Sequence, residues 1–107
     1  MIYTPDRWVI LKITDKEHTI YKVLAGWFGG YLEGDSWKLN SGITKIEMDG
    51  DYYLFHGYSG SVYKCHKNAY GFTSLTGSIF ATWKEQHPDN FEVIKEGSLD
   101  VLRQTYS

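Results

Sequence analysis

The first long strand that the sequence predicts, residues 7–14, is apolar on both faces. Its alternating positions are Val9, Leu11 and Ile13 on one side, and Trp8 and Ile10 on the other. The return strand, 19–25, follows a polar turn and has the same two-sided pattern. Strands of this kind belong in the centre of a sheet or in a closed barrel. The alternative is an edge strand that pairs with a second copy of the chain.

Glycines and turn residues divide the next part of the chain into short strands. We expect strands at 26–32 and 37–39 around a four-residue turn at 33–36, with a bulge or sharp bend at Gly29-Gly30. The glycines of this segment lack the spacing of a phosphate-binding loop, so we expect no nucleotide site here.

The clearest hairpin signal is Asp49-Gly50, because this dipeptide supplies the positive φ angles that a two-residue loop needs. The register that follows pairs Met48 with Asp51, Ile46 with Tyr53, and Thr44 with Phe55. The expected core face holds Thr44, Ile46, Met48, Tyr53 and Phe55. The other face, expected to be at least half solvated, holds Lys45, Glu47, Tyr52, Leu54 and His56.

The loop of the next hairpin, at 58–60, decides which residues of the strand 61–66 are buried. A two-residue loop would bury Lys64, whereas a three-residue loop with Gly60 in the left-handed conformation would bury Cys65. A slip of one residue exchanges the two faces of a strand, and a buried lysine is the costlier outcome. The sequence therefore predicts the three-residue loop, with the thiol in the core and the histidines of both strands outside.

A helix is predicted over residues 74–86, where Leu75, Ile79 and Trp83 recur at every fourth position. His87-Pro88 ends this pattern. A last strand is expected at 91–95.

A final helical turn is expected at 99–104, with Ser98 as its cap. Together the elements predict a β-dominated α+β fold, with about seven short antiparallel strands and one packed helix. The strands would form a bent sheet or a partly open small barrel, of SH3-like or OB-like architecture. We expect one domain, 1–107, because the chain has only 107 residues.

Charge and cysteine content narrow the class of function. The chain has 11 basic and 13 acidic residues, which argues against a protein that binds nucleic-acid phosphates. Its apolar runs are far shorter than the ~20 residues of a membrane span, so we expect no membrane partner. The N-terminus lacks the pattern of a signal peptide, and Cys65 is the single cysteine. We therefore expect a cytoplasmic location.

The outer face of the hairpin around residue 57 is the candidate binding surface. In the predicted register it carries Tyr52, His56, Lys64 and His66, with His66 across from Tyr52 and His56 across from Val62. Tyrosine and histidine combine contact area with hydrogen bonding. The simpler interpretation is an ordinary amphipathic sheet face, or one that the helix 74–86 covers.

We expect no catalytic residues, no metal site and no cofactor. A buried Cys65 lacks the exposure and the cationic neighbour that a nucleophilic thiolate needs. Cys65 and His66 are adjacent on a strand, so their side chains point to opposite faces and do not share one zinc ion. The carboxylates around Gly34 and Gly50 suit turns and lack the spacing of a calcium-binding loop.

Four segments are similar to small uncharacterised proteins of tailed bacteriophages, particularly marine ones. They are MIYTPD at 1–6, GWFGGY at 26–31, WKLNSGI at 37–43 and GYSGSVYKCHK at 57–67. The resemblance implies a phage or environmental origin and expression inside an infected bacterium. It carries over no functional residue.

These observations favour a non-enzymatic binding module, such as a phage accessory protein that docks on a host or phage protein. One alternative is a binder of single-stranded nucleic acid or oligosaccharide that uses surface aromatic residues. Another is a small enzyme or metal site that uses His56, His66 or Cys65. Association into a homodimer is compatible with each of these.

Overall fold

The computed structural model describes residues 1–29 and 34–107, and these residues form eight strands, two α-helices and one short 3-10 helix. The strands are β1 (Ile2–Tyr3), β2 (Arg7–Asp15), β3 (His18–Trp27), β4 (Ser36–Leu39), β5 (Ile43–Asp49), β6 (Tyr52–Gly57), β7 (Val62–His66) and β8 (Phe91–Val93). The helices are α1 (Ser74–Gln86), η1 (Glu96–Ser98) and α2 (Leu99–Thr105). The predicted β-dominated α+β class is confirmed.

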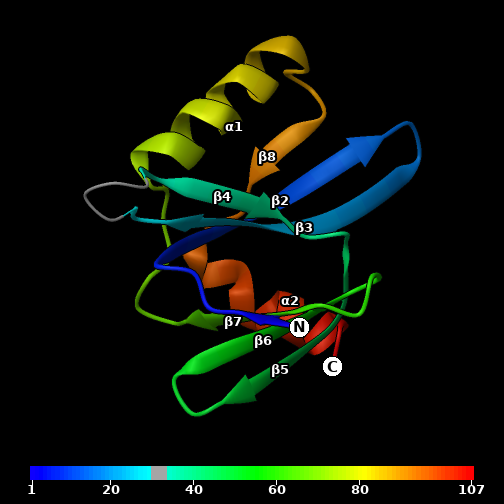
Figure 1. Ribbon diagram of the computed structural model, residues 1–107. Helices are drawn as coiled ribbons and strands as arrows, with labels where there is room; N and C mark the ends of the chain where they lie inside the picture. Colours follow the sequence, from blue (N-terminus) through cyan, green and yellow to red (C-terminus); the bar gives the residue numbers. More distant parts are fainter. Residues whose placement is uncertain (30–33) are drawn as a thin grey trace.

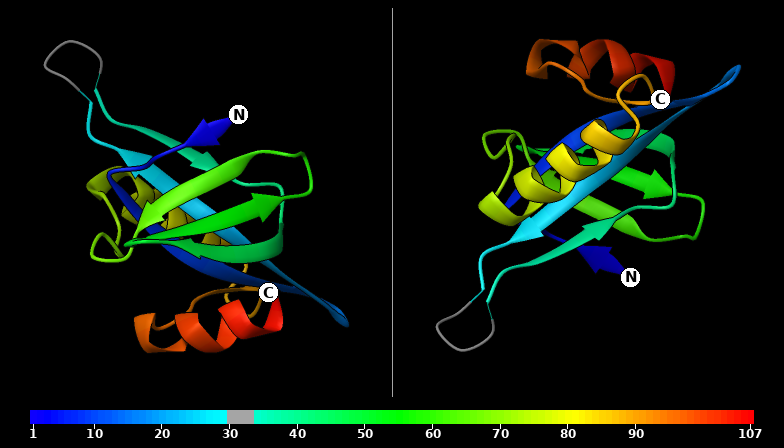
Figure 2. Two further views of the ribbon diagram at one scale, coloured as in Figure 1. Left: turned by 90° about the horizontal axis from the view of Figure 1, so that it is seen from below. Right: turned by 90° about the horizontal axis from the view of Figure 1, so that it is seen from above.

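Two four-stranded sheets make up the β structure (Figure 1). Sheet A has the strand order β1-β7-β6-β5, and sheet B has the order β4-β3-β2-β8. All pairs are antiparallel except β1 with β7, which the sequence analysis did not predict. The second helix, α2, lies beside β5, on the side of the sandwich opposite β1 and β4 (Figure 2, left).

Sheet B is the middle layer of the molecule, because α1 packs across one of its faces and sheet A packs on the other (Figures 1 and 2). This arrangement explains why β2 and β3 are apolar on both sides. Trp8 and Ile10 face the core between the sheets, whereas Val9 and Leu11 face α1. Strand β2 pairs with β3 and β8 of the same chain, so the prediction of a sheet-centre strand is confirmed.

Trp8 joins the two sheets at the centre of the core. Its side chain is fully buried, and its ring lies 5.3 Å from that of Phe55 and 4.8 Å from that of Tyr70. Its indole N–H donates a 2.8 Å hydrogen bond to the backbone carbonyl of His66. Replacement of such a residue by alanine costs about 3–5 kcal/mol in comparable cores.

The β6–β7 hairpin has the predicted register. Tyr52 pairs with His66, and His56 pairs with Val62. Gly60 has φ +91° in the three-residue loop, and Cys65 is fully buried.

The predicted register of the β5–β6 hairpin is wrong by two residues. Asp49 pairs with Tyr52, so the loop is Gly50-Asp51. Gly50 alone has a positive φ in this loop, which suits a turn with glycine at its first central position. A shift of two residues keeps each side chain on its predicted side. Thr44 and Met48 are nevertheless exposed rather than in the core, and a bulge interrupts pairing between Ile43 and Lys45.

Helix α1 has the predicted bounds, and Trp83 of the expected stripe packs on sheet B, but Leu75 and Ile79 do not join it there. Phe80 takes the place of Leu75 and Ile79 in the packed face, and Thr76 is buried. The start of the helix also lies very close to β3. A Cβ on Gly26 would lie 2.7 Å from Thr73 Cγ2.

The ends of the remaining predicted elements need smaller corrections. Strand β8 ends at Val93, and the side chain of Ser98 makes no capping hydrogen bond to α2. Strand β4 begins at Ser36, one residue earlier than expected. The predicted strand at 26–32 is wrong in its described part, because Gly26 and Trp27 belong to β3 and residues 28 and 29 form no strand. Gly30 of the predicted bend and residue 33 of the predicted turn lie outside the described residues.

Candidate functional site

The four residues of the predicted binding surface all lie on the outer face of sheet A. Tyr52, His56, Lys64 and His66 are each half-buried, and they alternate along β6 and β7 with the buried side chains of the core. Helix α1 packs on sheet B, so the alternative in which it covers this face is wrong (Figure 2).

The side chains of this outer face contact and pair with one another. The ring centroids of Tyr52 and His66 lie 4.9 Å apart, and Lys64 Nζ lies 4.8 Å from the centroid of Tyr52. Glu47 makes 3.0 Å contacts with both His56 Nε2 and Lys45 Nζ. The hydrogen bond with His56, and then that with Lys45, lower the pKa of the Glu47 carboxyl. A ligand on this face would have to compete with these contacts.

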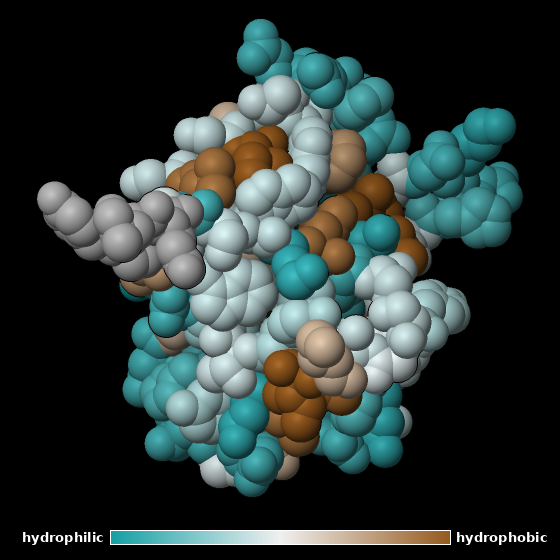
Figure 3. All heavy atoms as spheres, viewed as in Figure 1, coloured by the Kyte–Doolittle hydropathy of each residue, from teal (hydrophilic) through white to brown (hydrophobic). Residues whose placement is uncertain are grey.

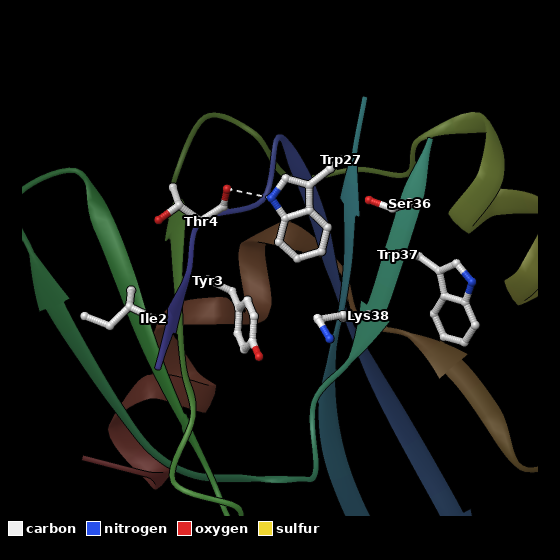
Figure 4. A pocket seen from close by; sticks show the side chains of 7 residues that line it. All are labelled: Ile2, Tyr3, Thr4, Trp27, Ser36, Trp37 and Lys38. Carbon is white, nitrogen blue, oxygen red and sulfur yellow. Dashed lines mark hydrogen bonds between the residues drawn. The ribbon is translucent and has the colours of Figure 1, made fainter. Parts of the chain in front are cut away.

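A cavity of about 540 Å³ lies elsewhere, between the edge strand of sheet A and the edge strand of sheet B. We call it the edge cleft. Its lining comes from β1, the end of β3 and β4: Ile2, Tyr3, Thr4, Trp27, Ser36, Trp37 and Lys38 (Figure 4). The volume is within the range of about 300–1,000 Å³ that ligand-binding pockets usually have.

Three side chains give the edge cleft its chemical character. In Figure 4, Tyr3, Trp27 and Lys38 point toward a common space from β1, β3 and β4, whereas Trp37 points away from it. The rings of Tyr3 and Trp27 meet edge to face with centroids 6.3 Å apart. Lys38 Nζ lies 5.1 Å from the centroid of Tyr3. The cleft therefore combines aromatic walls with one positive charge.

The aromatic walls are held in place by the fold. Trp27 donates its indole N–H to the backbone carbonyl of Thr4 at 2.9 Å, which joins β3 to the segment after β1 (Figure 4). Tyr3 packs on Tyr63 of β7 with ring centroids 5.1 Å apart. A site held by rigid strands is positioned before its ligand arrives, which lowers the entropic cost of binding.

Exposed hydrophobic residues surround the edge cleft. Ile2 and Trp37 line it and are 66% and 40% exposed. A hydrophobic patch is visible beside the N-terminus in Figure 3. Exposed apolar groups around a concave site are typical of surfaces that bind another molecule.

The sequence analysis missed the edge cleft, because its walls come from segments that are far apart in the sequence. The nearest available signal was the predicted hairpin that contains Trp27 and Lys38. The two-residue strand β1 has no alternating pattern, and its pairing with β7 places Tyr3 opposite Tyr63.

The prediction that Cys65 is a packed core residue is confirmed. The side chain is fully buried beneath β6 and β7, and burial raises the pKa of its thiol well above the ordinary value. His66 lies on the opposite face of the same strand. Within residues 1–29 and 34–107, no group of three or more His, Cys, Asp or Glu side chains has the geometry of a metal site.

Neither a membrane-spanning helix nor a related protein points to a function for this chain. No helix in the described part of the chain is both long and apolar enough to cross a membrane. A search of protein-family models, curated proteins and solved structures finds no match to this chain.

Proposed function

We propose that the chain is a non-catalytic binding module, that the edge cleft is its binding site, and that its ligand is another protein. The observation that carries this proposal is the position of Tyr3, Trp27 and Lys38 around an open cavity of about 540 Å³. These residues provide contact area, a fixed shape and one charge, which are the features that determine affinity and specificity in protein interfaces.

The edge cleft is a better binding site than the outer face of sheet A. On the outer face, Glu47 already pairs with His56 and Lys45, and Lys64 lies 4.0 Å from the carboxylate of Asp49. In the edge cleft, the cation lies over an aromatic ring and apolar groups around it are in contact with solvent. Covering these apolar groups gains about 25 cal/mol for each Å² removed from water.

A protein ligand fits the surroundings of the cleft better than a nucleic acid does. The exposed apolar residues of the lining, Ile2 and Trp37, favour an apolar partner surface. Lys38 is the single charged residue in the described part of the lining, whereas binding of a nucleic-acid backbone requires several cations. The resemblance to phage proteins suggests that the partner is a phage or host protein. The free thiol of Cys65 suits a reducing compartment such as the cytoplasm.

The proposal is tested by selecting peptides from a displayed random library on the folded chain and titrating the selected peptides by NMR. We expect the largest amide shift changes at Tyr3, Trp27 and Lys38. Lys38→Glu should weaken binding at least fivefold, whereas the matched variant Lys64→Glu, on the outer face, should leave it unchanged.

The same titration covers the competing functions. A mixed single-stranded oligonucleotide and a set of short oligosaccharides serve as the other probes. Shift changes on the outer face of sheet A, tight binding of an oligonucleotide or oligosaccharide, or a library from which no peptide is enriched would each contradict the proposal.

A further inference from the structure

We infer that the ligand of the edge cleft is an extended peptide segment, which adds to sheet B as a new strand beside β4 and places an acidic side chain against Lys38. This inference rests on the proposed function, and it adds both the backbone conformation and the charge of the ligand. Three independent features support it: the hydrogen-bonding pattern of β4, the direction of its side chains, and the charge of the cleft.

The backbone of β4 is available on one side. This strand is at the end of the order in sheet B and pairs there with β3. The N–H of Asn40 donates to the carbonyl of Val23 at 3.0 Å, so residues 40, 38 and 36 direct their backbone groups toward β3. Trp37 and Leu39 therefore direct their N–H and C=O groups outward, which is the template that strand addition uses.

The opposite side of the sandwich shows what a covered edge looks like in this fold. There, the segment after β8 folds into α2, which packs beside β5 (Figure 2, left). The carbonyl of Tyr106 accepts a 2.9 Å hydrogen bond from the N–H of Ile46, so the outer edge of β5 has a backbone partner. Among the described residues, β4 pairs only with β3.

The two faces of β4 differ, and the side chains of an added strand would continue both of them. Ser36 and Lys38 point into the edge cleft, whereas Leu39 packs with the residues under α1 and Trp37 lies against Trp83 with ring centroids 5.7 Å apart. Side chains of an added strand alternate in the same way. One set would meet Lys38 and Tyr3, and the other set would extend the apolar surface of Trp37.

The charge of the cleft selects an acidic side chain on the first of these faces. Among the residues that the structure describes, only Lys38 brings a charge to the lining of the cleft. It makes no ion pair with any described residue, and its ammonium group lies over the Tyr3 ring instead. An aspartate or glutamate on the ligand would therefore find a cation within reach in a partly enclosed site.

A second copy of this chain fits the same edge less well. Pairing of β4 with its own copy about a two-fold axis would place two Lys38 side chains on one face of the joined sheet. Like charges that face each other across paired strands are destabilising. An acidic peptide has the opposite charge, so we assign it as the occupant.

The inference is tested with arrays of seven-residue peptides in which the outer positions are random and the central position is glutamate, glutamine or lysine. We expect the wild-type chain to retain glutamate peptides about tenfold more strongly than their glutamine counterparts. Lys38→Gln should abolish this preference, and Lys38→Glu should transfer it to the lysine peptides. Lys45→Gln, on the outer face of sheet A, is the matched control and should change nothing.

A second measurement tests the backbone pairing separately from the charge. The strongest glutamate peptides are resynthesised with N-methyl groups at alternate residues, in the two complementary sets. Methylation of the set that faces β4 should reduce binding about tenfold or more, and the other set should have a small effect.

Each outcome distinguishes the inference from the function on which it rests. Peptides that shift the amides of the edge cleft without preferring glutamate, or that tolerate both methylation sets, would overturn the inference and leave the proposed function standing. Peptides that bind only outside the cleft would contradict both. Concentration-dependent dimerisation by light scattering that the neutral variant Lys38→Gln strengthens would show that a second copy occupies the edge.

Discussion

The hydroxyl group of Tyr70 completes the pairing between β2 and the residue that follows β8. Ile94 donates its N–H to the carbonyl of Ile10 at 3.1 Å, as in an antiparallel pair. The reciprocal bond is replaced by the hydroxyl, which accepts a 3.2 Å bond from the N–H of Ile10 and donates a 2.7 Å bond to the carbonyl of Ile94. Tyr70→Phe would remove the bridge and leave the aromatic ring in place.

We expect Tyr70→Phe to lower the free energy of unfolding by about 2–4 kcal/mol. The variant leaves two backbone groups without a partner, and each such buried group costs about 1–3 kcal/mol. The N–H belongs to Ile10, which is fully buried, so water does not replace the lost partner there. Urea denaturation should show a lower midpoint with an unchanged m-value.

The matched control is Tyr63→Phe, because Tyr63 is also buried but its hydroxyl makes no hydrogen bond to a described residue. Its unfolding free energy should change by less than about 1 kcal/mol. An equally small change for Tyr70→Phe would refute the reasoning. It would mean that the two strands close up and form the direct bond between Ile10 and Ile94.

Three further predictions concern pH, packing and thiol reactivity. Burial raises the pKa of Tyr70 from 10.0 to about 12. The stability that depends on the protonated hydroxyl is therefore complete below pH 10 and is lost as the pH rises toward 12. The difference in unfolding free energy between wild type and Tyr70→Phe should shrink over this range. Gly26→Ala should destabilise the protein by about 1–3 kcal/mol in a thermal melt, because its Cβ would lie 2.7 Å from the capping residue Thr73, whereas Gly97→Ala, with no atom within 4 Å, should be neutral. Cys65 should react with a thiol reagent only at the rate of global unfolding, and rapid labelling of the folded chain would contradict its burial.

Local patterns in the sequence were enough to predict the central strands and the helix. The two-sided strand at 7–14 lies between two neighbours, and the helix 74–86 has the predicted bounds. The hairpin with Cys65 was predicted because the two registers differed strongly in cost, one burying a lysine and the other a thiol. These decisions depend on residues within a few positions of one another.

The wrong predictions arose where alternatives had similar local energies. Asp49-Gly50 and Gly50-Asp51 are both acceptable two-residue loops, and the bulge after Ile43 gave no sign in the sequence. In α1, the helix start lies close to Gly26, and Thr76 rather than Ile79 is buried there. A period of four residues alone does not specify that rotation.

Of the candidate site, the sequence predicted the outer face of sheet A and missed the edge cleft. Alternation along a single hairpin was sufficient to place Tyr52, His56, Lys64 and His66 on one face. The cleft requires Tyr3, Trp27 and Lys38, which meet only after both sheets have packed. Whether either surface binds a partner stays a prediction that the experiments above address.

The pairing of β1 with β7 also bears on how the chain acquires its final form. Ile2 lies beside Val62, so β1 pairs with a segment that is synthesised about sixty positions later. Hairpins such as β2–β3 close within a few residues, whereas contacts of long sequence separation form slowly because of their loop entropy. The wall that carries Tyr3 should therefore be among the last parts to become ordered, and a nascent chain that ends before residue 62 would lack it.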